Sequence, residues 1–250
     1  MLPTLVHSDE LPQPERRGVV PFGIDERTMS PVMLDLDSSD RHMLLLGDEQ
    51  SGKSSLLAHI MTTLAGQYTS EEMVFAVYDP RRSLKGLVHE DQLGGYATSS
   101  SLAQRLTDAV TRELQSRVPD DPLTAAQTTG FDGPRVVLIV DDYDVLTAGG
   151  NAPLRGFSEY LAMGAEIGLH AFIARKARGA SRSMFEPFTS SVRDAGGDTF
   201  LMDGDRSEGP LINNIRARRQ PPGRGLFIRG AQAPSTVQTI FREGHHDAAS

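Results

Sequence analysis

The chain has 250 residues, a net charge of −8, 38% hydrophobic residues and no cysteine, a composition typical of a folded soluble protein with one large α/β domain or two small ones. The lack of cysteine excludes disulfide scaffolds, thiol nucleophiles and cysteine-ligated metal sites, and the acidic balance argues against general nucleic-acid binding. No stretch is apolar enough to span a membrane, and the N-terminus has no signal-peptide pattern.

Residues 1–30 are rich in proline, arginine and acidic residues, so we expect them to form an N-terminal arm or linker. Residues 31–244 are expected to form a single domain, and residues 245–250 a flexible polar tail. Strands are expected at 32–34, 42–46, 73–78, 136–140, 170–174, 199–202, 226–228 and 237–241, and helices at 54–64, 102–114, 154–167 and 184–192. This alternation predicts an α/β fold whose mostly parallel sheet has helices on both faces.

A glycine-rich loop joins the strand at 42–46 to the helix that begins at Ser54. It matches the pattern GxxxxGK[ST] through Gly47, Asp48, Glu49, Gln50, Ser51, Gly52, Lys53 and Ser54. The glycines let backbone N–H groups face an anion, Lys53 adds positive charge, and the Ser54 hydroxyl can bind Mg²⁺. We therefore predict an ATP site made by this loop and Ser55. The carboxylates of Asp48 and Glu49 either point outward into solvent or weaken binding.

Three aspartates follow the apolar strand at 136–140. Asp141 lies at the strand's carboxyl end, where ligands of open α/β sheets bind, so we predict that it holds Mg²⁺ together with Ser54. Many ring ATPases have a glutamate at the next position to polarise the attacking water, and Asp142 is one methylene shorter. Asp142 is therefore a candidate catalytic base whose competence stays open, and Asp144 is expected to be a solvated loop residue.

Around these motifs the chain resembles the FtsK/SpoIIIE family of P-loop ATPases, with their RecA/FtsK-like fold, and within it the EccC ATPases of type VII (ESX) secretion. The resemblance rests on residues 21–26 (PFGIDE), 31–36 (PVMLDL), 78–84 (YDPRRSL), 201–209 (LMDGDRSEG) and 221–225 (PPGRG). It implies ATP and Mg²⁺ as ligands, stacking on neighbouring ATPase domains of the same secretion protein, and a hexameric ring in the full complex. It also implies a pocket for the C-terminal signal of secreted WXG100-type substrates, and a place in the cytoplasm at the inner face of the plasma membrane.

Two departures distinguish the chain from active members of that family. Asp142 stands where they have glutamate, and residues 174–178 (ARKAR) replace their Ala-Thr-Gln-Arg-Pro stretch, which puts Arg175 at the sensor position. The resemblance therefore implies a degenerate domain, the third rather than the second of an EccC protein, that binds ATP with weak or no hydrolysis. The alternatives are a fully active ATP-hydrolysing motor and an FtsK-type DNA translocase; the departures count against the first and the acidic charge against the second.

Two groups of residues have alternative interpretations. The first could line an apolar groove for a partner helix or belong to the core: Met184, Phe185, Phe188, Leu211 and Ile212. The second could reach a neighbour's nucleotide or be solvated: Arg216, Arg218, Arg219, Arg224 and Arg229.

Overall fold

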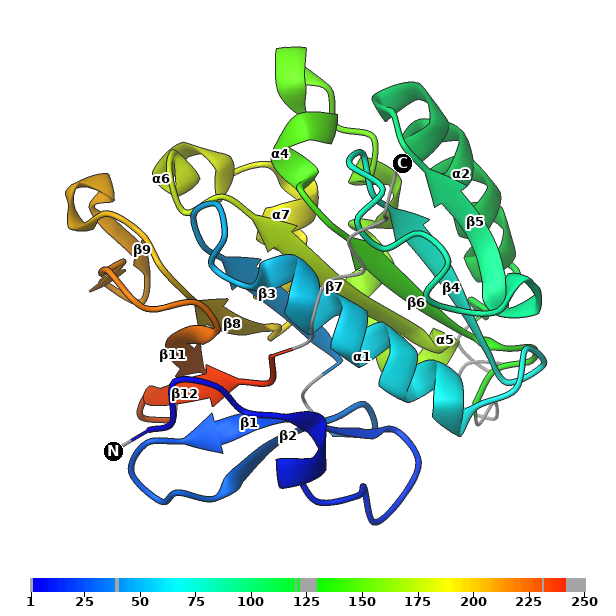
Figure 1. Ribbon diagram of the computed structural model, residues 1–250. Helices are drawn as coiled ribbons and strands as arrows, with labels where there is room; N and C mark the ends of the chain where they lie inside the picture. Colours follow the sequence, from blue (N-terminus) through cyan, green and yellow to red (C-terminus); the bar gives the residue numbers. More distant parts are fainter. Residues whose placement is uncertain (1, 39–40, 120, 122–129, 231, 242–250) are drawn as a thin grey trace, which may run out of the picture.

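The computed structural model describes residues 2–38, 41–119, 121, 130–230 and 232–241. A ten-stranded sheet with the strand order β2-β1-β12-β11-β8-β3-β7-β6-β4-β5 runs through the molecule (Figure 1). A separate ribbon pairs β9 (Pro210–Ile212) with β10 (Ile215–Arg216). The predicted tail at 245–250 lies outside the described residues.

Six strands form the parallel half of the sheet. They are β3 (His42–Leu46), β4 (Met73–Tyr78), β5 (Leu93–Ala97), β6 (Arg135–Val140), β7 (Leu169–Arg175) and β8 (Asp198–Leu201). Every residue of β3 and β7 is buried, because a parallel sheet is covered on both faces and its central strands meet no water.

Four strands form the antiparallel half. They are β11 (Arg224–Ile228), β12 (Ser235–Thr239), β1 (Val19–Asp25) and β2 (Pro31–Asp35). This half joins the parallel one where β11 pairs antiparallel with β8.

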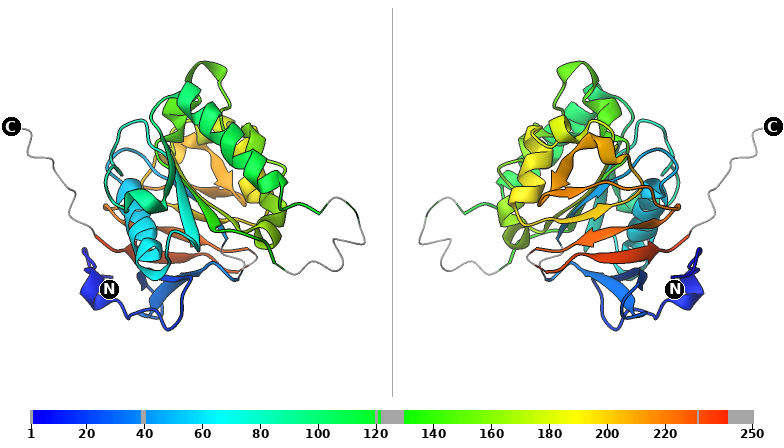
Figure 2. Two further views of the ribbon diagram at one scale, coloured as in Figure 1. Left: turned by 90° about the vertical axis from the view of Figure 1, so that its right-hand side faces the viewer. Right: turned by 90° about the vertical axis from the view of Figure 1, so that its left-hand side faces the viewer.

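Helices cover both faces of the sheet, as Figure 2 shows with the sheet between α1 and α2. The first face holds α1 (Lys53–Gln67), whose predicted apolar stripe of Leu56, Leu57, Ile60, Met61 and Leu64 is buried. The other face is covered by α2 (Ser100–Gln115), α4 (Tyr143–Leu146), α5 (Gly164–Ile167), α6 (Ala180–Ser183) and α7 (Pro187–Asp194). The predicted α/β P-loop fold, with a mostly parallel sheet and helices on both faces, is confirmed.

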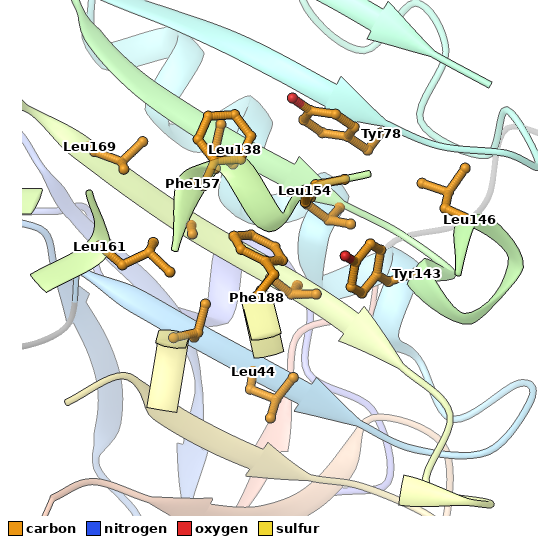
Figure 3. Packing of buried hydrophobic residues seen from close by; sticks show 14 of the residues in the cluster. Leu44, Tyr78, Leu138, Tyr143, Leu146, Leu154, Phe157, Leu161, Leu169 and Phe188 are labelled. Atoms are coloured by element: carbon orange, nitrogen blue, oxygen red, sulfur yellow. The ribbon is translucent and has the colours of Figure 1, made fainter. Parts of the chain in front are cut away.

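Aromatic rings fill the core on the second face (Figure 3). The Phe188 ring meets the Tyr143 ring edge-on at 5.7 Å, and the Phe157 ring meets that of Tyr78 at 6.3 Å. These fully buried rings connect α7 and α4 to the strands beneath them. Burial of such rings removes a large apolar area from water, so this cluster is a main source of stability for the parallel half.

Several sequence-based boundaries need correction. The expected arm over 1–30 is largely part of the fold: β1 begins at Val19 and lies inside the sheet, and Val6 and Leu11 are buried in one cluster with Ile240. The predicted helix at 154–167 is a series of short helical turns, at Arg155–Phe157, Leu161–Met163 and Gly164–Ile167, and the backbone leaves the helical conformation at Met163. The helix expected at 184–192 begins only at Pro187, the first residue of α7, and the short helix α6 precedes it at Ala180–Ser183.

Candidate functional site

The glycine-rich loop joins β3 to α1 at the carboxyl edge of the sheet. Gly52 caps α1 with φ +103°, a left-handed conformation that side chains other than glycine rarely adopt. A Cβ atom on Gly47 would collide with the Ser51 Oγ and Cβ atoms. The glycines are therefore required by the tight path of the backbone, which exposes the first N–H groups of a 15-residue helix to a ligand.

Lys53 is folded over this loop. Its Nζ atom donates to the carbonyl oxygen of Gly47 at 2.7 Å and to that of Asp48 at 2.8 Å. Burial lowers the pKa of Lys53, and the nearby carboxylates of Asp141 and Asp142 oppose that shift. The ammonium group lies where it can turn from these carbonyls to the phosphates of a nucleotide.

Asp141 directly follows β6 beside the loop and is fully buried. One carboxylate oxygen accepts from the Ser83 hydroxyl at 2.9 Å and the other from the Asp142 backbone N–H at 2.9 Å, and the Ser54 side chain is a further hydrogen-bond partner. Burial raises the pKa of this carboxyl, while the Ser54 hydrogen bond opposes that shift. A carboxylate and a hydroxyl in contact at a phosphate loop are hard oxygen ligands, and they fit Mg²⁺.

Asp142 has a conformation that the sequence did not predict. Its φ of +43° lies in the left-handed region, and its carboxylate forms an ion pair with Arg81 at 2.7 Å between Nε and Oδ2. Arg81 comes from the loop after β4, in the stretch that carries the resemblance at 78–84. A general base has to reach the attacking water, and this carboxylate is engaged by a cation instead.

Arg175, the sensor-position candidate, is buried with its guanidinium in a polar cluster. It pairs with Asp144 at 3.0 Å, donates to Thr189 Oγ1 at 2.7 Å and lies 4.9 Å from the Tyr143 ring centroid. Its backbone oxygen accepts from the Gly47 N–H at 3.1 Å, so the main chain of this residue bonds to the phosphate loop while its side chain bonds to Asp144 and Thr189. Asp144 is consequently no solvated loop residue but the anchor of Arg175 and of the Lys176 N–H.

The two carboxylates inside the loop have cationic or N–H partners. Glu49 pairs with Lys176 at 3.0 Å, which lowers the pKa of Glu49, and Asp48 accepts from the Arg178 backbone N–H at 3.1 Å. Both side chains therefore reach toward residues 176–178, so these contacts offset the charge they bring close to a polyphosphate.

The loop opens into a cavity of about 860 Å³. On one side it is lined by residues 49–55, Arg81 and Asp142, which includes most of the predicted loop. The other side is lined by residues that sequence reasoning missed: Thr4, Leu5, Pro221, Pro222, Gly223, Gln238, Thr239, Ile240 and Phe241. Only the motif at 221–225 gave a signal for this wall, because nothing local relates residues 4–5 to a phosphate loop.

Several arginines of the C-terminal part have partners within the domain. Arg224 donates to the carbonyl oxygen of Pro3 at 2.9 Å, Arg229 to that of Met33 at 2.8 Å, and Arg219 pairs with Asp203 at 3.1 Å. Those contacts favour an internal structural role for these three over a reach toward a neighbour's nucleotide.

Comparisons with known proteins agree with this geometry. Residues 4–143 match the model of the FtsK/SpoIIIE family. The ESX secretion system protein EccC of Thermomonospora curvata is 34% identical over 247 residues, covering 97% of this chain and 19% of that protein. The ESX-4 secretion system protein EccC4 of Mycobacterium tuberculosis is 32% identical over 223 residues, covering 88% and 18%.

A solved structure of Thermomonospora curvata EccC, comprising ATPases 2 and 3 in complex with a signal sequence peptide, superposes with a TM-score of 0.90 at 33% identity. It is matched over 98% of this chain and 44% of that one. The chain thus spans about a fifth of the length of the two curated relatives. None of the helices in the described part of the chain has the length and hydrophobicity needed to cross a bilayer.

Proposed function

Because this chain belongs to the FtsK/SpoIIIE family, with EccC secretion ATPases among its relatives, we propose that it is an ATP- and Mg²⁺-binding domain of a type VII secretion ATPase. The observation that carries the proposal is the loop at 47–54 with Lys53 folded over it and the Ser54–Asp141 pair beside it. Together these supply N–H groups, a cation and hard oxygen ligands to one polyphosphate.

We further propose that the domain hydrolyses ATP weakly or not at all. Asp142 is short for a general base and is paired with Arg81, and Arg175 is buried against Asp144 at the sensor position. Neither group is free to orient an attacking water, although nucleotide binding needs neither of them. This is the pattern of a regulatory, degenerate domain, and we place it third in an EccC-like protein, stacked on neighbouring ATPase domains in a hexameric ring at the cytoplasmic face of the membrane.

A role in recognising secreted WXG100-type substrates completes the proposal. The solved structure of ATPases 2 and 3 of Thermomonospora curvata EccC is a complex with a signal sequence peptide. The groove expected around Met184 and Phe188 is no candidate here, because both are buried in the core, as are Leu211 and Ile212. Of that group only Phe185 is exposed, at 78%.

An apolar pocket of about 470 Å³ is lined by α1, β4, β5 and the segment that connects β4 to β5. Its lining is mostly apolar, with a charged rim of Arg82, Lys85 and Glu90, and includes Met61, Val77, Leu84, Leu87, Val88, Leu93 and Tyr96. A cavity of this kind suits the apolar anchors of an amphipathic signal helix, with its polar face toward the rim. We therefore assign the signal to this pocket.

The nucleotide proposal is tested by calorimetric titration with Mg-ATP. Lys53→Ala should weaken ATP binding at least tenfold, since a charge-assisted contact contributes about 1.5–3 kcal/mol. Lys85→Ala is the matched control, because Lys85 lies on the rim of the other pocket. Unchanged ATP affinity in Lys53→Ala would refute the site, and turnover of about 1 s⁻¹ or faster by the isolated domain would refute degeneracy.

The signal proposal is tested by fluorescence anisotropy with a labelled C-terminal peptide of a cognate substrate. We expect only micromolar affinity, because a short helix must be ordered on binding. Binding should be lost in Val88→Asp, which places a charge in the apolar lining of the pocket. Phe185→Asp serves as the control, since it places the same charge on an exposed site outside the pocket. If both variants bind the peptide equally well, the signal binds to another surface of the protein.

A further inference from the structure

The nucleotide cavity has an apolar half that the phosphate chemistry leaves unexplained. It is formed by Leu5, the turn at 221–223, Ile240 and Phe241, opposite the charged groups of the phosphate loop. A volume of about 860 Å³ lies in the range of sites that enclose a whole small ligand rather than its charged end alone.

Two of the lining side chains are unusual in being large, apolar and exposed. Leu5 is 46% and Phe241 is 44% accessible. Among the described residues the other large apolar side chains that are similarly exposed are Met29, Val145 and Phe185, none of which lines this cavity. Exposed apolar side chains that meet at one cavity indicate a ligand with an apolar face.

This wall is fixed in place by contacts that span the whole sequence. Arg224 donates to the Pro3 carbonyl oxygen at 2.9 Å, and the Phe241 N–H donates to the Val6 carbonyl oxygen at 2.8 Å. Val6 and Leu11 are buried in one cluster with Ile240, and this packing holds the N-terminal segment against the end of β12. The N-terminal segment therefore lies along the end of β12, as Figure 1 shows, and holds Leu5 at the cavity.

The same wall is joined directly to the phosphate loop. The Gly223 N–H donates to the Ser51 carbonyl oxygen at 2.8 Å, and Thr239 donates to the Gly223 carbonyl oxygen through its backbone N–H at 2.7 Å. A Cβ atom on Gly52 would lie 3.1 Å from the Gly223 nitrogen, so the two loops are in close contact. A ligand held by the phosphate loop thus lies beside the apolar wall at a fixed spacing.

We propose that Leu5 and Phe241 form the subsite for the purine base of the nucleotide, an inference that rests on the proposed nucleotide-binding function. A base is flat and apolar on its faces, and an aromatic ring and a branched aliphatic side chain are suitable surfaces for it. Pro221 and Pro222 line the same wall and have no N–H to offer to the base edge, so the contact proposed for the base is stacking on the two apolar side chains.

The experiment compares two ligands, ATP and inorganic tripolyphosphate, by calorimetry. Phe241→Ala should weaken ATP binding about tenfold, as the loss of a base–aromatic contact does, and leave tripolyphosphate binding unchanged. Leu5→Ala should act in the same direction with a smaller effect, and the matched controls Phe185→Ala and Met29→Ala should change neither affinity. Circular dichroism confirms that each variant is folded, which is expected because all four side chains are exposed.

The outcomes separate this inference from the proposed function. ATP affinity unchanged in Phe241→Ala, or an equal loss of ATP and tripolyphosphate binding, would overturn the base subsite while the phosphate site stands. Failure of the unaltered protein to bind either ligand would instead refute nucleotide binding itself. A selective loss of ATP binding in both wall variants is the result that supports the proposal.

Discussion

The parallel and antiparallel halves of the sheet contribute different chemistry to one cavity. The parallel half supplies the charged and polar groups of the phosphate loop together with Asp142, whereas β12, the turn before β11 and the N-terminal segment supply the apolar wall. Of the first set, the phosphate loop is assembled from a short stretch around one strand–helix junction. The second needs partners as distant as Arg224 and Pro3, which are 221 residues apart.

The difference shows how the two kinds of recognition are encoded. Polyphosphate binding depends on backbone N–H groups at a helix N-terminus, so a local motif is enough to specify it. An apolar wall has no motif, because any apolar side chain brought to the right place by tertiary contacts can form it. The following changes break or sharpen this contrast, from the largest expected effect to the smallest.

Gly223→Ala breaks the contact between the halves. Gly223 has φ +76°, and a Cβ atom there would lie 2.7 Å from Gln238 Nε2. We expect a loss of about 2–3 kcal/mol in the free energy of unfolding, from backbone strain and crowding together, with weaker ATP binding. Urea denaturation measures it, and Gly179→Ala is the control because its φ is +77° with open space around it. Equal losses in both variants would show that only the backbone strain matters.

Acid should weaken the parallel half, which holds the buried histidines of the described chain, His42 and His170. Burial lowers the pKa of His42 to about 4, and burial with nearby positive charge lowers that of His170 as well. The unfolded chain therefore binds more protons than the folded one between about pH 6.5 and pH 4, and stability falls as pH falls through that window.

For His42 alone the loss at pH 5 amounts to about 2 kcal/mol relative to pH 7.5. Urea denaturation at the two pH values measures it, and His42→Asn should reduce the difference. A stability that is the same at both pH values would contradict the assignment of neutral buried imidazoles.

Asp141→Asn separates stability from binding within the parallel half. Since burial raises the pKa of Asp141, its carboxylate form is disfavoured in the folded state at neutral pH, and a neutral amide should stabilise the protein by about 1 kcal/mol. The same change removes a carboxylate ligand, so the gain in ATP affinity on adding Mg²⁺ should be lost. Thermal unfolding and titrations with and without Mg²⁺ test both parts, and an undiminished Mg²⁺ effect would exclude Asp141 as a ligand.

Arg81→Ala should have the smallest effect on stability, below about 1 kcal/mol, because the Arg81–Asp142 pair is partly exposed. Its value lies in the turnover measurement, for which Arg82→Ala is the neighbouring control. If the ion pair restrains Asp142, ATP turnover should rise in Arg81→Ala alone. Unchanged turnover would mean that the side-chain length of Asp142 limits the reaction by itself.

The sequence was sufficient for the features that are local in the chain. Strands β3 and β4 begin and end at the predicted residues, and the apolar stripe of α1 is buried as expected. In contrast β5 was missed, because Gly94 and Gly95 resemble a turn, and a Cβ atom on Gly95 would collide with Leu106 of α2. That glycine is required by close packing with a helix, which no local pattern reveals.

The same limit applies to the site. The loop at 47–54 was recognised by its spacing. Arg81, which pairs with Asp142, lies about 60 residues before it in the chain, and its stretch at 78–84 was singled out only for its family resemblance. Asp144 and Arg175 were each interpreted by position, and their mutual ion pair emerged only when β7 was placed beside β6. Pairing across strands is therefore the information that a single sequence lacks.

The resting position of Lys53 has a consequence for the energetics of ligand capture. A free lysine side chain loses about 2 kcal/mol of rotamer entropy when it is immobilised. Here the Gly47 and Asp48 carbonyl oxygens already hold the ammonium group, so that loss accompanies folding instead of accompanying the arrival of phosphate. An incoming nucleotide exchanges two internal hydrogen bonds for contacts with its own oxygens and meets a preorganised cation, which lowers the entropic cost of association.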